Sequence, residues 1–377
     1  MLVTLFLFSF LLFCVFEWKP AWTRFFGLGQ LHYYALRERY IPDDALVFRV
    51  RPFFKILSSD FKGELYHEQY QVKVEPIPSE YFYDQNSFRN SSEDDSYDLV
   101  VLGDSYAAVG HTEQDMFSKR LEKHTNLTAM NLGQGWYGPF QYLEVLKKYG
   151  LAKKPKVALF CFFEGNDLKD VREYLRWKNG GNYYHFNLTS KNFLHRYILA
   201  LRSLAGFGKK RLGEVVRANI HPDLANIRLR DKDYKAIIHY RANEKQAEEI
   251  LRSQEGESLR RLIREFKDIC EARHIMPLIV FIPTKSHIYA EWTDEKSGQA
   301  WLAARAGEIR NKANVEKAVG QICEELRIPF IDLTPRYESL AREGVLLYHP
   351  FDTHWNSEGR EAAARFVAQE LEKRREI

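Results

Sequence analysis

Several short runs of this chain are apolar throughout, and this feature constrains the fold most. Residues 100–102, 157–163 and 276–282 carry no charged side chain and do not alternate with polar residues. Such runs are typical of strands buried on both faces of a parallel sheet. Stretches with helical character lie between them, for example residues 140–148 and 357–373. The alternation predicts an α/β fold with a doubly wound parallel sheet flanked by helices.

Small polar residues follow several of these strands. Ser105 comes directly after Gly103 and Asp104, a glycine-rich loop over residues 133–138 follows a short strand, and Asn166 follows residues 157–163. Ligands of open parallel sheets bind at the carboxyl ends of the strands, so these residues are expected to share one edge. The alternative interpretation of Asp104 and Ser105 is an ordinary helix cap.

Two further polar residues, Asp352 and His354, precede the last helix. Acyl transfer requires a nucleophile, a base, a group that orients the base, and donors for the oxyanion. The chain supplies them in the order Ser105, glycine loop, Asn166, Asp352, His354. Each falls at or near a predicted strand end, which favours catalysis over isolated structural roles.

These local motifs, in this order, resemble those of the SGNH (GDSL-like) hydrolase family. The run 103–106 resembles the nucleophile block, with Tyr106 where the eponymous leucine would stand. The run 131–138 resembles the second block, 165–167 the third, and 352–356 the last. The resemblance covers about residues 97–170 and 276–373, and it implies a three-layer, flavodoxin-like α/β fold.

The resemblance also implies site roles. Ser105 would be the nucleophile, His354 the base and Asp352 the acid that orients it. The oxyanion hole would combine the N–H of Ser105, the N–H of Gly135 and the side-chain amide of Asn166. Gly138 is the alternative donor from the glycine-rich loop. The family mechanism needs no metal and no organic cofactor.

The acid and the base lie two residues apart, whereas the commonest spacing in the family is three. Side chains two apart point the same way on an extended segment, so residues 352–354 are expected to be extended, with the helix starting near Asn356 or Ser357. His349 is the rival base. His287 is interpreted as a loop or substrate-contact residue.

The leading functional hypothesis is a serine esterase or O-acyltransferase that acts on envelope or exported carbohydrate, with acetyl as the expected acyl group. The Asp-x-His-Trp form of the last block favours relatives that acetylate or deacetylate polysaccharides. Two alternatives remain: a lipid esterase or thioesterase of the same fold, and a catalytically inactive protein that binds or assembles polysaccharide. The net charge of +4 is too small to indicate nucleic-acid binding.

The first 18 residues predict a membrane anchor. Residues 1–16 contain no charged side chain, and an 18-residue helix at about 1.5 Å per residue just spans a bilayer. Small residues that would mark a cleavage site are nearly absent there. We therefore expect a membrane-anchored protein whose catalytic part is periplasmic or extracellular, although the basic residues after the span argue for the opposite orientation.

The remaining chain is divided by composition. Residues 19–96 are expected to form an irregular extension with small antiparallel strands, and residues 97–377 the hydrolase-like domain. Residues 171–245, basic and aromatic, interrupt the alternation and are expected to form a helical insertion. A long helix over residues 244–273 is predicted to kink near Gly256. The four cysteines show no metal or redox spacing and are expected to be free thiols.

Overall fold

The computed structural model describes residues 7–8, 10–15, 38–66, 72–91, 94–181, 197–198, 201 and 224–374. The chain divides into two compact units, one of Met1–Phe54 with Leu175–Asn219 and one of Lys55–Tyr174 with Ile220–Ile377. The first unit contains an antiparallel hairpin of β1 (Tyr40–Asp43) and β2 (Val47–Val50).

The described part of the chain holds no helix with the length and apolarity that a membrane span requires. The predicted anchor over residues 1–18 lies largely outside the described residues, so it stays a prediction. Residues 182–223 of the predicted insertion lie outside the described residues apart from 197–198 and 201, so the expectation of helical structure stays a prediction there.

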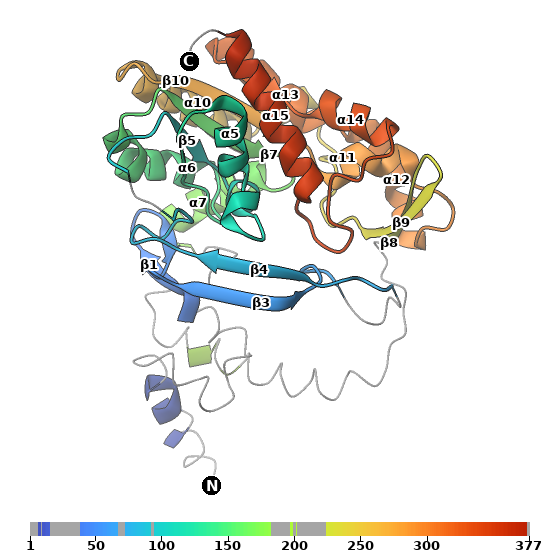
Figure 1. The fold of residues 1–377 in the computed structure, drawn as a ribbon, viewed down its shortest axis with the longest axis horizontal. Helices are drawn as coiled ribbons and strands as arrows, with labels where there is room; N and C mark the ends of the chain where they lie inside the picture. Colours follow the sequence, from blue (N-terminus) through green and yellow to red (C-terminus); the bar gives the residue numbers. More distant parts are fainter. Residues whose placement is uncertain are drawn as a thin grey trace. The chain divides into compact units, whose positions relative to one another are not determined.

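The second unit is built on a five-stranded sheet in the order β11-β10-β7-β5-β6 (Figure 1). All four strand pairs are parallel. In chain order this is the 2-1-3-4-5 arrangement of flavodoxin-like folds, so the predicted doubly wound sheet is confirmed. The strands are β5 (Leu99–Leu102), β6 (Ala129–Asn131), β7 (Val157–Phe163), β10 (Met276–Ile282) and β11 (Phe330–Asp332).

The central strand β7 shows why the apolar runs form this sheet. All seven of its residues are buried, and it pairs with β5 on one side and β10 on the other. A strand covered on both faces has no solvent-facing side chains, which explains the continuous apolar sequence. The chain order reverses between β5 and β7, and the segments that follow these two strands therefore flank the switch point where ligands bind in such sheets.

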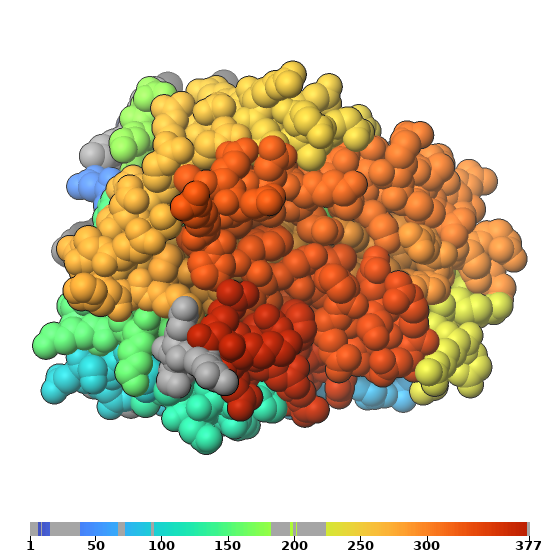
Figure 2. Space-filling view, turned by 90° about the horizontal axis from the view of Figure 1, so that it is seen from above, coloured from blue at the N-terminus to red at the C-terminus, as the bar shows by residue number. Residues whose placement is uncertain are grey.

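Helices cover the sheet (Figure 1). Helix α5 packs on α15, and α10 packs on α6, α13 and strand β10. In Figure 2 the C-terminal segments, orange to red, lie side by side on one surface of this unit. The helices are α4 (Ser105–Ala108), α5 (Phe117–Thr125), α6 (Pro139–Val145), α7 (Asp167–Lys178), α9 (Ala247–Arg252), α10 (Gln254–Glu271), α11 (Lys285–Tyr289), α12 (Gln299–Asn311), α13 (Asn314–Leu326), α14 (Thr334–Arg342) and α15 (Ser357–Lys373).

The long helix predicted over residues 244–273 is instead two helices, α9 and α10, separated at Ser253. The Ser253 side chain caps α10 by accepting a hydrogen bond from the N–H of Gly256. A Cβ at Gly256 would lie 2.1 Å from the carbonyl oxygen of Ile250. The glycine is therefore needed for close packing between the two helices, and the break comes at the serine cap before it.

Two antiparallel hairpins complete the second unit. One joins β3 (Lys55–Phe61) and β4 (Ile77–Phe82), as expected for small strands in the N-terminal extension. The other joins β8 (Leu224–Leu229) and β9 (Lys232–Ile237) and lies within the insertion that we expected to be helical. That expectation is wrong for residues 224–237, where Arg230 in a left-handed conformation closes a two-residue turn.

The cysteines are free, as predicted. Cys161 lies in β7, Cys270 in α10 and Cys323 in α13, and all three are buried. Burial raises the pKa of the Cys161 thiol well above its usual value and the pKa of the Cys270 and Cys323 thiols to about 12. They are therefore packing residues of the core.

Candidate active site

Ser105 lies at the carboxyl end of β5, where the strand turns into the four-residue helix α4. Gly103 makes this turn possible, because a Cβ there would come within 2.8 Å of the Ala107 side chain. Asp104 caps the helix by accepting a hydrogen bond of 2.8 Å from the N–H of Tyr106. The cap interpretation is thus correct for Asp104, and it leaves the Ser105 hydroxyl directed toward another partner.

That partner is His354. Its Nε2 lies 2.7 Å from the Ser105 Oγ, and its Nδ1 lies 2.5 Å from the Asp352 Oδ1. The two residues come from the segment between α14 and α15, and His354 is 249 positions away from Ser105 in the sequence. The structure therefore brings together the three side chains that the sequence singled out, in hydrogen-bond order serine, histidine, aspartate.

Residues 352–354 are not an extended strand, which corrects our expectation. They form a bend in which the Asp352 carboxylate accepts a hydrogen bond of 2.9 Å from the His354 N–H, two residues ahead. This Asx-type turn, rather than strand geometry, brings the Asp352 carboxylate to the imidazole ring of His354. The predicted helix start is confirmed, because α15 begins at Ser357 with Asn356 as its cap.

Electrostatics couple the acid to the base. Burial alone would raise the pKa of Asp352, but the positive charge of His354 and hydrogen bonds from the N–H groups of His354 and Glu64 hold it below its usual range. Burial alone would lower the pKa of His354, but the Asp352 carboxylate outweighs burial and raises it to about 9. Protonated His354 is therefore stabilised by Asp352, as proton transfer from a serine requires.

Tyr106, which stands in place of the family's leucine, also contacts the loop of the acid and base. Its hydroxyl donates a hydrogen bond of 2.5 Å to the carbonyl oxygen of Thr353. Its ring stacks on Phe163 at a centroid distance of 4.0 Å and packs against the rings of His354 and Trp355. The tyrosine thus links the strand that carries Ser105 to the loop that carries His354.

The other candidate histidines lie elsewhere. The Nε2 of His349 faces the Nε2 of His111 at 3.2 Å, and burial lowers its pKa to about 3. His287 is 2% exposed and its Nδ1 lies 3.0 Å from Glu164, so our interpretation of a loop or substrate-contact residue is wrong. It is the third residue after the Thr284 cap of α11 and is buried there.

The glycine-rich loop passes beside the serine. A Cβ on Gly135 would lie 3.7 Å from the Cβ of Ser105. The N–H of Gly138 donates to the Gln141 side chain at 2.9 Å and caps α6, so it is already engaged. Asn131 shapes the start of the loop by accepting a hydrogen bond of 3.1 Å from the N–H of Gly133. The geometry favours Gly135 over Gly138 as the loop donor.

Asn166 follows β7, on the other side of the switch point. Its Nδ2 donates a hydrogen bond of 2.7 Å to Asp170 in the first turn of α7. Beneath it lie three buried carboxyl groups, those of Asp104, Asp167 and Asp170. Burial raises the pKa of Asp104 to about 7, with Asp170 adding to the effect, and burial also raises the pKa of Asp167 well above its usual value. Carboxyl groups packed this closely retain protons, because they cannot all ionise together.

Sequence reasoning missed a segment that touches the acid. The N–H of Glu64 donates a hydrogen bond of 3.0 Å to the second Asp352 oxygen, and the N–H of Leu65 donates to the carbonyl oxygen of Phe351 at 2.9 Å. Gly63 makes this approach possible: its φ is +110°, and a Cβ would lie 2.2 Å from the Phe351 carbonyl oxygen. The one signal in the sequence was this glycine in an otherwise irregular extension.

Part of the candidate site also has the residue types that bind a metal ion. Among the residues that the structure describes, ligand atoms of Glu64, Asp352 and His354 lie within 4.8 Å of one another. However, Asp352 and His354 are already joined by a hydrogen bond, and His354 is joined to Ser105. Asp352 and His354, as they stand, are arranged for proton transfer from Ser105.

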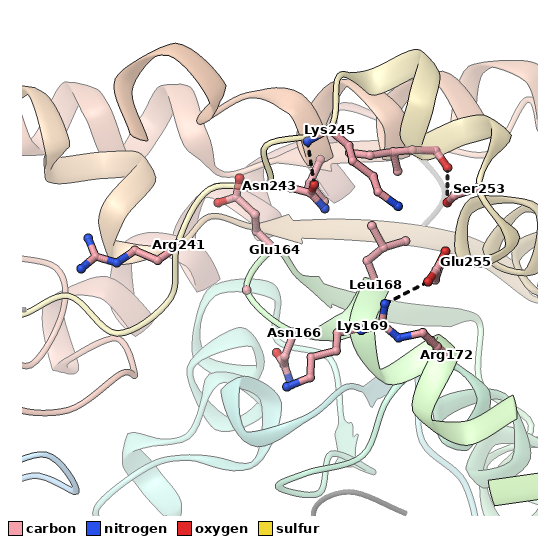
Figure 3. Close-up of a pocket in the computed structure, with 13 residues that line it drawn as sticks. Glu164, Asn166, Leu168, Lys169, Arg172, Arg241, Asn243, Lys245, Ser253 and Glu255 are labelled. Atoms are coloured by element: carbon pink, nitrogen blue, oxygen red, sulfur yellow. Dashed lines mark hydrogen bonds and ion pairs between the residues drawn. The ribbon is translucent and has the colours of Figure 1, made fainter. Parts of the chain in front are cut away.

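A polar cleft of about 280 Å³ opens at Asn166 (Figure 3). Of its 13 lining residues, only Leu168, Ile250 and Val315 carry aliphatic side chains. Figure 3 shows Lys169 and Arg172 on one wall, from α7, and Asn243 and Lys245 on the facing wall. Arg172 is paired with Glu255 at 3.2 Å. The cleft therefore presents both charged groups and aliphatic surface to a ligand.

A Ser-His-Asp arrangement of this kind is the one that serine hydrolases and acyltransferases use. More particularly, residues 240–377 match the family model described as the SGNH hydrolase-like domain of the acetyltransferase AlgX. The matched segment contains Asp352 and His354, whereas Ser105 and Asn166 precede it. The match therefore shows that residues 240–377 are similar to this domain.

Comparison with solved structures returned SGNH-type hydrolases at low identity. A GDSL-like lipase from Bacteroides thetaiotaomicron is 11% identical, with 73% of this chain and 88% of that chain covered and a TM-score of 0.33. A lipase/acylhydrolase from Enterococcus faecalis is 11% identical (73% and 95% covered, TM-score 0.37). The esterase EstA from a Pseudoalteromonas species is 9% identical (75% and 100% covered, TM-score 0.35). No curated protein matches the sequence.

Proposed function

We propose that this protein is a serine esterase or O-acyltransferase of the SGNH type that transfers acetyl groups of carbohydrates. The observation that carries the proposal is the continuous hydrogen-bond chain from the Ser105 Oγ through His354 to Asp352, with distances of 2.7 and 2.5 Å. The family match to the AlgX-type domain supports the same chemistry.

In this mechanism the Ser105 Oγ attacks the carbonyl carbon of an acetyl ester while His354 takes the hydroxyl proton. Asp352 keeps the imidazole in the required tautomer and stabilises the imidazolium. The tetrahedral intermediate then collapses, the alkoxide of the substrate leaves with the proton from His354, and the acetyl group stays on Ser105. Water or a sugar hydroxyl, deprotonated by His354, releases it.

The negative oxygen of the intermediate needs donors that are already in place. Ser105 begins α4, so its N–H has no partner within the helix, and Gly135 lies beside it. Asn166 donates one N–H to Asp170, and its second N–H completes the set, because an amide NH₂ has two donors. One such donor is typically worth about 3 kcal/mol in the transition state.

The polar cleft at Asn166 supports carbohydrate over lipid. A long-chain acyl group would require an apolar channel, whereas amide, ammonium and guanidinium groups bind hydroxyl and carboxylate groups of sugars. We therefore expect turnover of acetylated sugars and of small acetyl esters, with long-chain esters poor substrates.

The test compares wild-type protein with Ser105→Ala on p-nitrophenyl acetate, on a long-chain ester and with a serine-directed fluorophosphonate. We expect acetyl turnover and labelling of the wild type, and neither for the variant. A folded wild type that is unlabelled and inactive would instead support the alternative of a carbohydrate-binding scaffold. Faster turnover of the long-chain ester would support the lipid esterase.

We also propose that residues 1–18 anchor the protein in a membrane, with the catalytic part periplasmic or extracellular. The uncharged sequence of residues 1–16 supports the proposal. A fusion of alkaline phosphatase to the C-terminus tests the orientation, because this reporter is active only outside the cytoplasm. Recovery of the full-length chain in the soluble fraction without detergent would contradict the anchor.

A further inference from the structure

Lys285 is a buried lysine that the mechanism above does not use. It is 5% exposed and begins α11, directly beyond the end of β10. Its Nζ donates to the carbonyl oxygens of His349 and Asp352, at 2.6 and 2.5 Å. It also reaches the carbonyl oxygens of Ile237 at 3.1 Å and Pro350 at 3.4 Å. One nitrogen therefore joins the end of β9 to the loop of residues 349–352.

The surroundings of this ammonium are unusual. Its hydrogen-bond partners among the described residues are carbonyl oxygens, and none is a carboxylate. Burial lowers the pKa of Lys285 to about 7, which the charge of Asp352 offsets only in part. A buried cation is costly unless its donors are satisfied, and converging carbonyl oxygens repel one another unless a donor lies between them. The ammonium and this loop conformation therefore depend on each other.

The loop that Lys285 contacts is the one that carries the acid. Asp352 accepts from Lys285 through its main-chain oxygen and from His354 through its carboxylate, so the lysine holds the backbone of the residue that orients the base. Within the described chain, Lys285 is the one cationic side chain that donates to carbonyl oxygens of residues 349–354. Other contacts to this loop come from neutral groups, including the Tyr106 hydroxyl and the N–H of Leu65.

We propose that Lys285 is a positioning residue: its ammonium fixes the backbone of residues 349–352 so that His354 stands within hydrogen-bond distance of Ser105. The proposal rests on the proposed function for the role of Ser105. It predicts that removal of the ammonium affects the chemical step, because misplacement of a base by about 1 Å can reduce a rate roughly 100-fold. Substrate binding in the cleft at Asn166 should change little.

The experiment uses the full chain and the variants Lys285→Met, Lys285→Arg and Lys312→Met. Methionine keeps the apolar stem without the charge, and arginine keeps the charge but spreads it over a planar group that cannot place one nitrogen among these carbonyls. Lys312 is the matched control, since it is partly buried and bonded to Glu291 and Glu338, away from the loop. The readouts are kcat and KM for p-nitrophenyl acetate, the rate of fluorophosphonate labelling, and hydrogen exchange of residues 347–356.

We expect Lys285→Met to lower kcat and the labelling rate roughly 10- to 100-fold, with KM within about threefold of wild type. Exchange of the loop amides should become faster. Lys285→Arg should show the same pattern in a smaller degree, and Lys312→Met should show neither effect. A folded Lys285→Met or Lys285→Arg protein with wild-type kcat, labelling and loop exchange would overturn the proposal.

The outcome is separable from that of the proposed function. If the wild type neither turns over esters nor reacts with the fluorophosphonate, the proposed function fails, and the hydrogen-exchange comparison still decides the role of Lys285. If Lys285→Met does not fold, the same measurements on Lys285→Arg are compared with those on the wild type. If the wild type is active and either folded variant matches it, only the positioning role fails.

Discussion

At the scale of single residues, the two-residue spacing of Asp352 and His354 sets the protonation of the base. The short contact raises the pKa of His354 to about 9, so the ring is protonated below that pH and cannot accept the serine proton. We expect the rate of fluorophosphonate labelling to rise about tenfold per pH unit up to about pH 7, and less steeply from there to pH 9 because the Lys285 ammonium loses its proton over that range. The measurement is the labelling rate between pH 6 and 10. A plateau that begins below pH 7 would contradict it.

The variant Asp352→Asn tests whether Asp352 is the cause of this pH dependence. An amide keeps the size of the side chain but removes the charge that raises the pKa of His354, so the inflection should move to lower pH. It also favours the wrong tautomer, and in a comparable triad this substitution lowers kcat roughly 10⁴-fold. A variant with unchanged kcat and unchanged inflection would show that Asp352 does not orient the base.

Asn166 gives a second prediction at this scale. Replacement of Asn166 by alanine removes a proposed oxyanion donor, and loss of one such donor typically lowers kcat roughly 10²- to 10³-fold. KM should change far less, because the interaction forms in the transition state. The control is Asn226→Ala in β8, which removes a buried amide bonded to Asp294 and should lower only the thermal midpoint. Equal effects of both variants on kcat would argue against the oxyanion role.

The residues of the candidate site were predictable to different degrees for a physical reason. Ser105, Asn166, Asp352 and His354 stand at the ends of strongly patterned elements, so local sequence places them. Glu64 contributes its main-chain N–H, which any residue but proline has, across 288 positions. No sequence pattern encodes such a contact.

At the scale of elements, the segment after β3 is held against the loop of the acid. Gly63→Ala should weaken this contact, because φ is +110° and the new Cβ would meet the Phe351 carbonyl oxygen at 2.2 Å. We expect a loss of roughly 1–3 kcal/mol in the free energy of unfolding, the cost of a strained backbone. Labelling of Ser105 should slow as well. The measurements are chemical denaturation and labelling kinetics.

Gly307→Ala is the control for that substitution. Gly307 lies in α12, and a Cβ there would meet no atom within 4 Å. Alanine should stabilise this helix by up to about 1 kcal/mol, since it has the higher helix propensity. Equal destabilisation by the two variants would show that the contact of Gly63 with Phe351 has no special importance.

Individual strands show where a sequence pattern is sufficient to predict the secondary structure. β7 and β10 have the predicted bounds, because seven consecutive apolar residues fit only a strand covered on both faces. The β8–β9 hairpin was missed, because charged residues such as Arg228, Asp233 and Lys235 lie on its exposed positions and resemble a solvated helix. Alternation in a strand with one exposed face is a weaker signal than a continuous apolar run.

At the scale of the whole molecule, the N-terminal extension from Lys55 belongs to the same compact unit as the sheet. Arg89 in this extension is 3% exposed and donates to the carbonyl oxygens of Ala108 at 2.8 Å and Gly110 at 2.9 Å, just beyond α4. The extension thus contacts the helix that carries Ser105 as well as the acid. The sequence suggested a boundary near residue 97 because the regular alternation of strands and helices begins there.

Two shortened chains test this arrangement. A chain that begins at Lys55 keeps these contacts and should be labelled at Ser105 at close to the full-length rate. A chain that begins at Tyr97 loses them, and we expect a lower thermal midpoint and at least roughly tenfold slower labelling. Equal labelling of the two chains would show that the extension is dispensable for the site.

The bend at residues 352–354 has one more consequence. Because the acid and the base are held together by the turn itself, they move as one piece whenever the loop moves. A displaced loop would keep its aspartate–histidine hydrogen bond while the contact of His354 with Ser105 is lost. In such an inactive form, spectroscopic probes of the aspartate–histidine pair would give the same signal as in the active form. Only a reagent that reacts with Ser105 would distinguish the two forms.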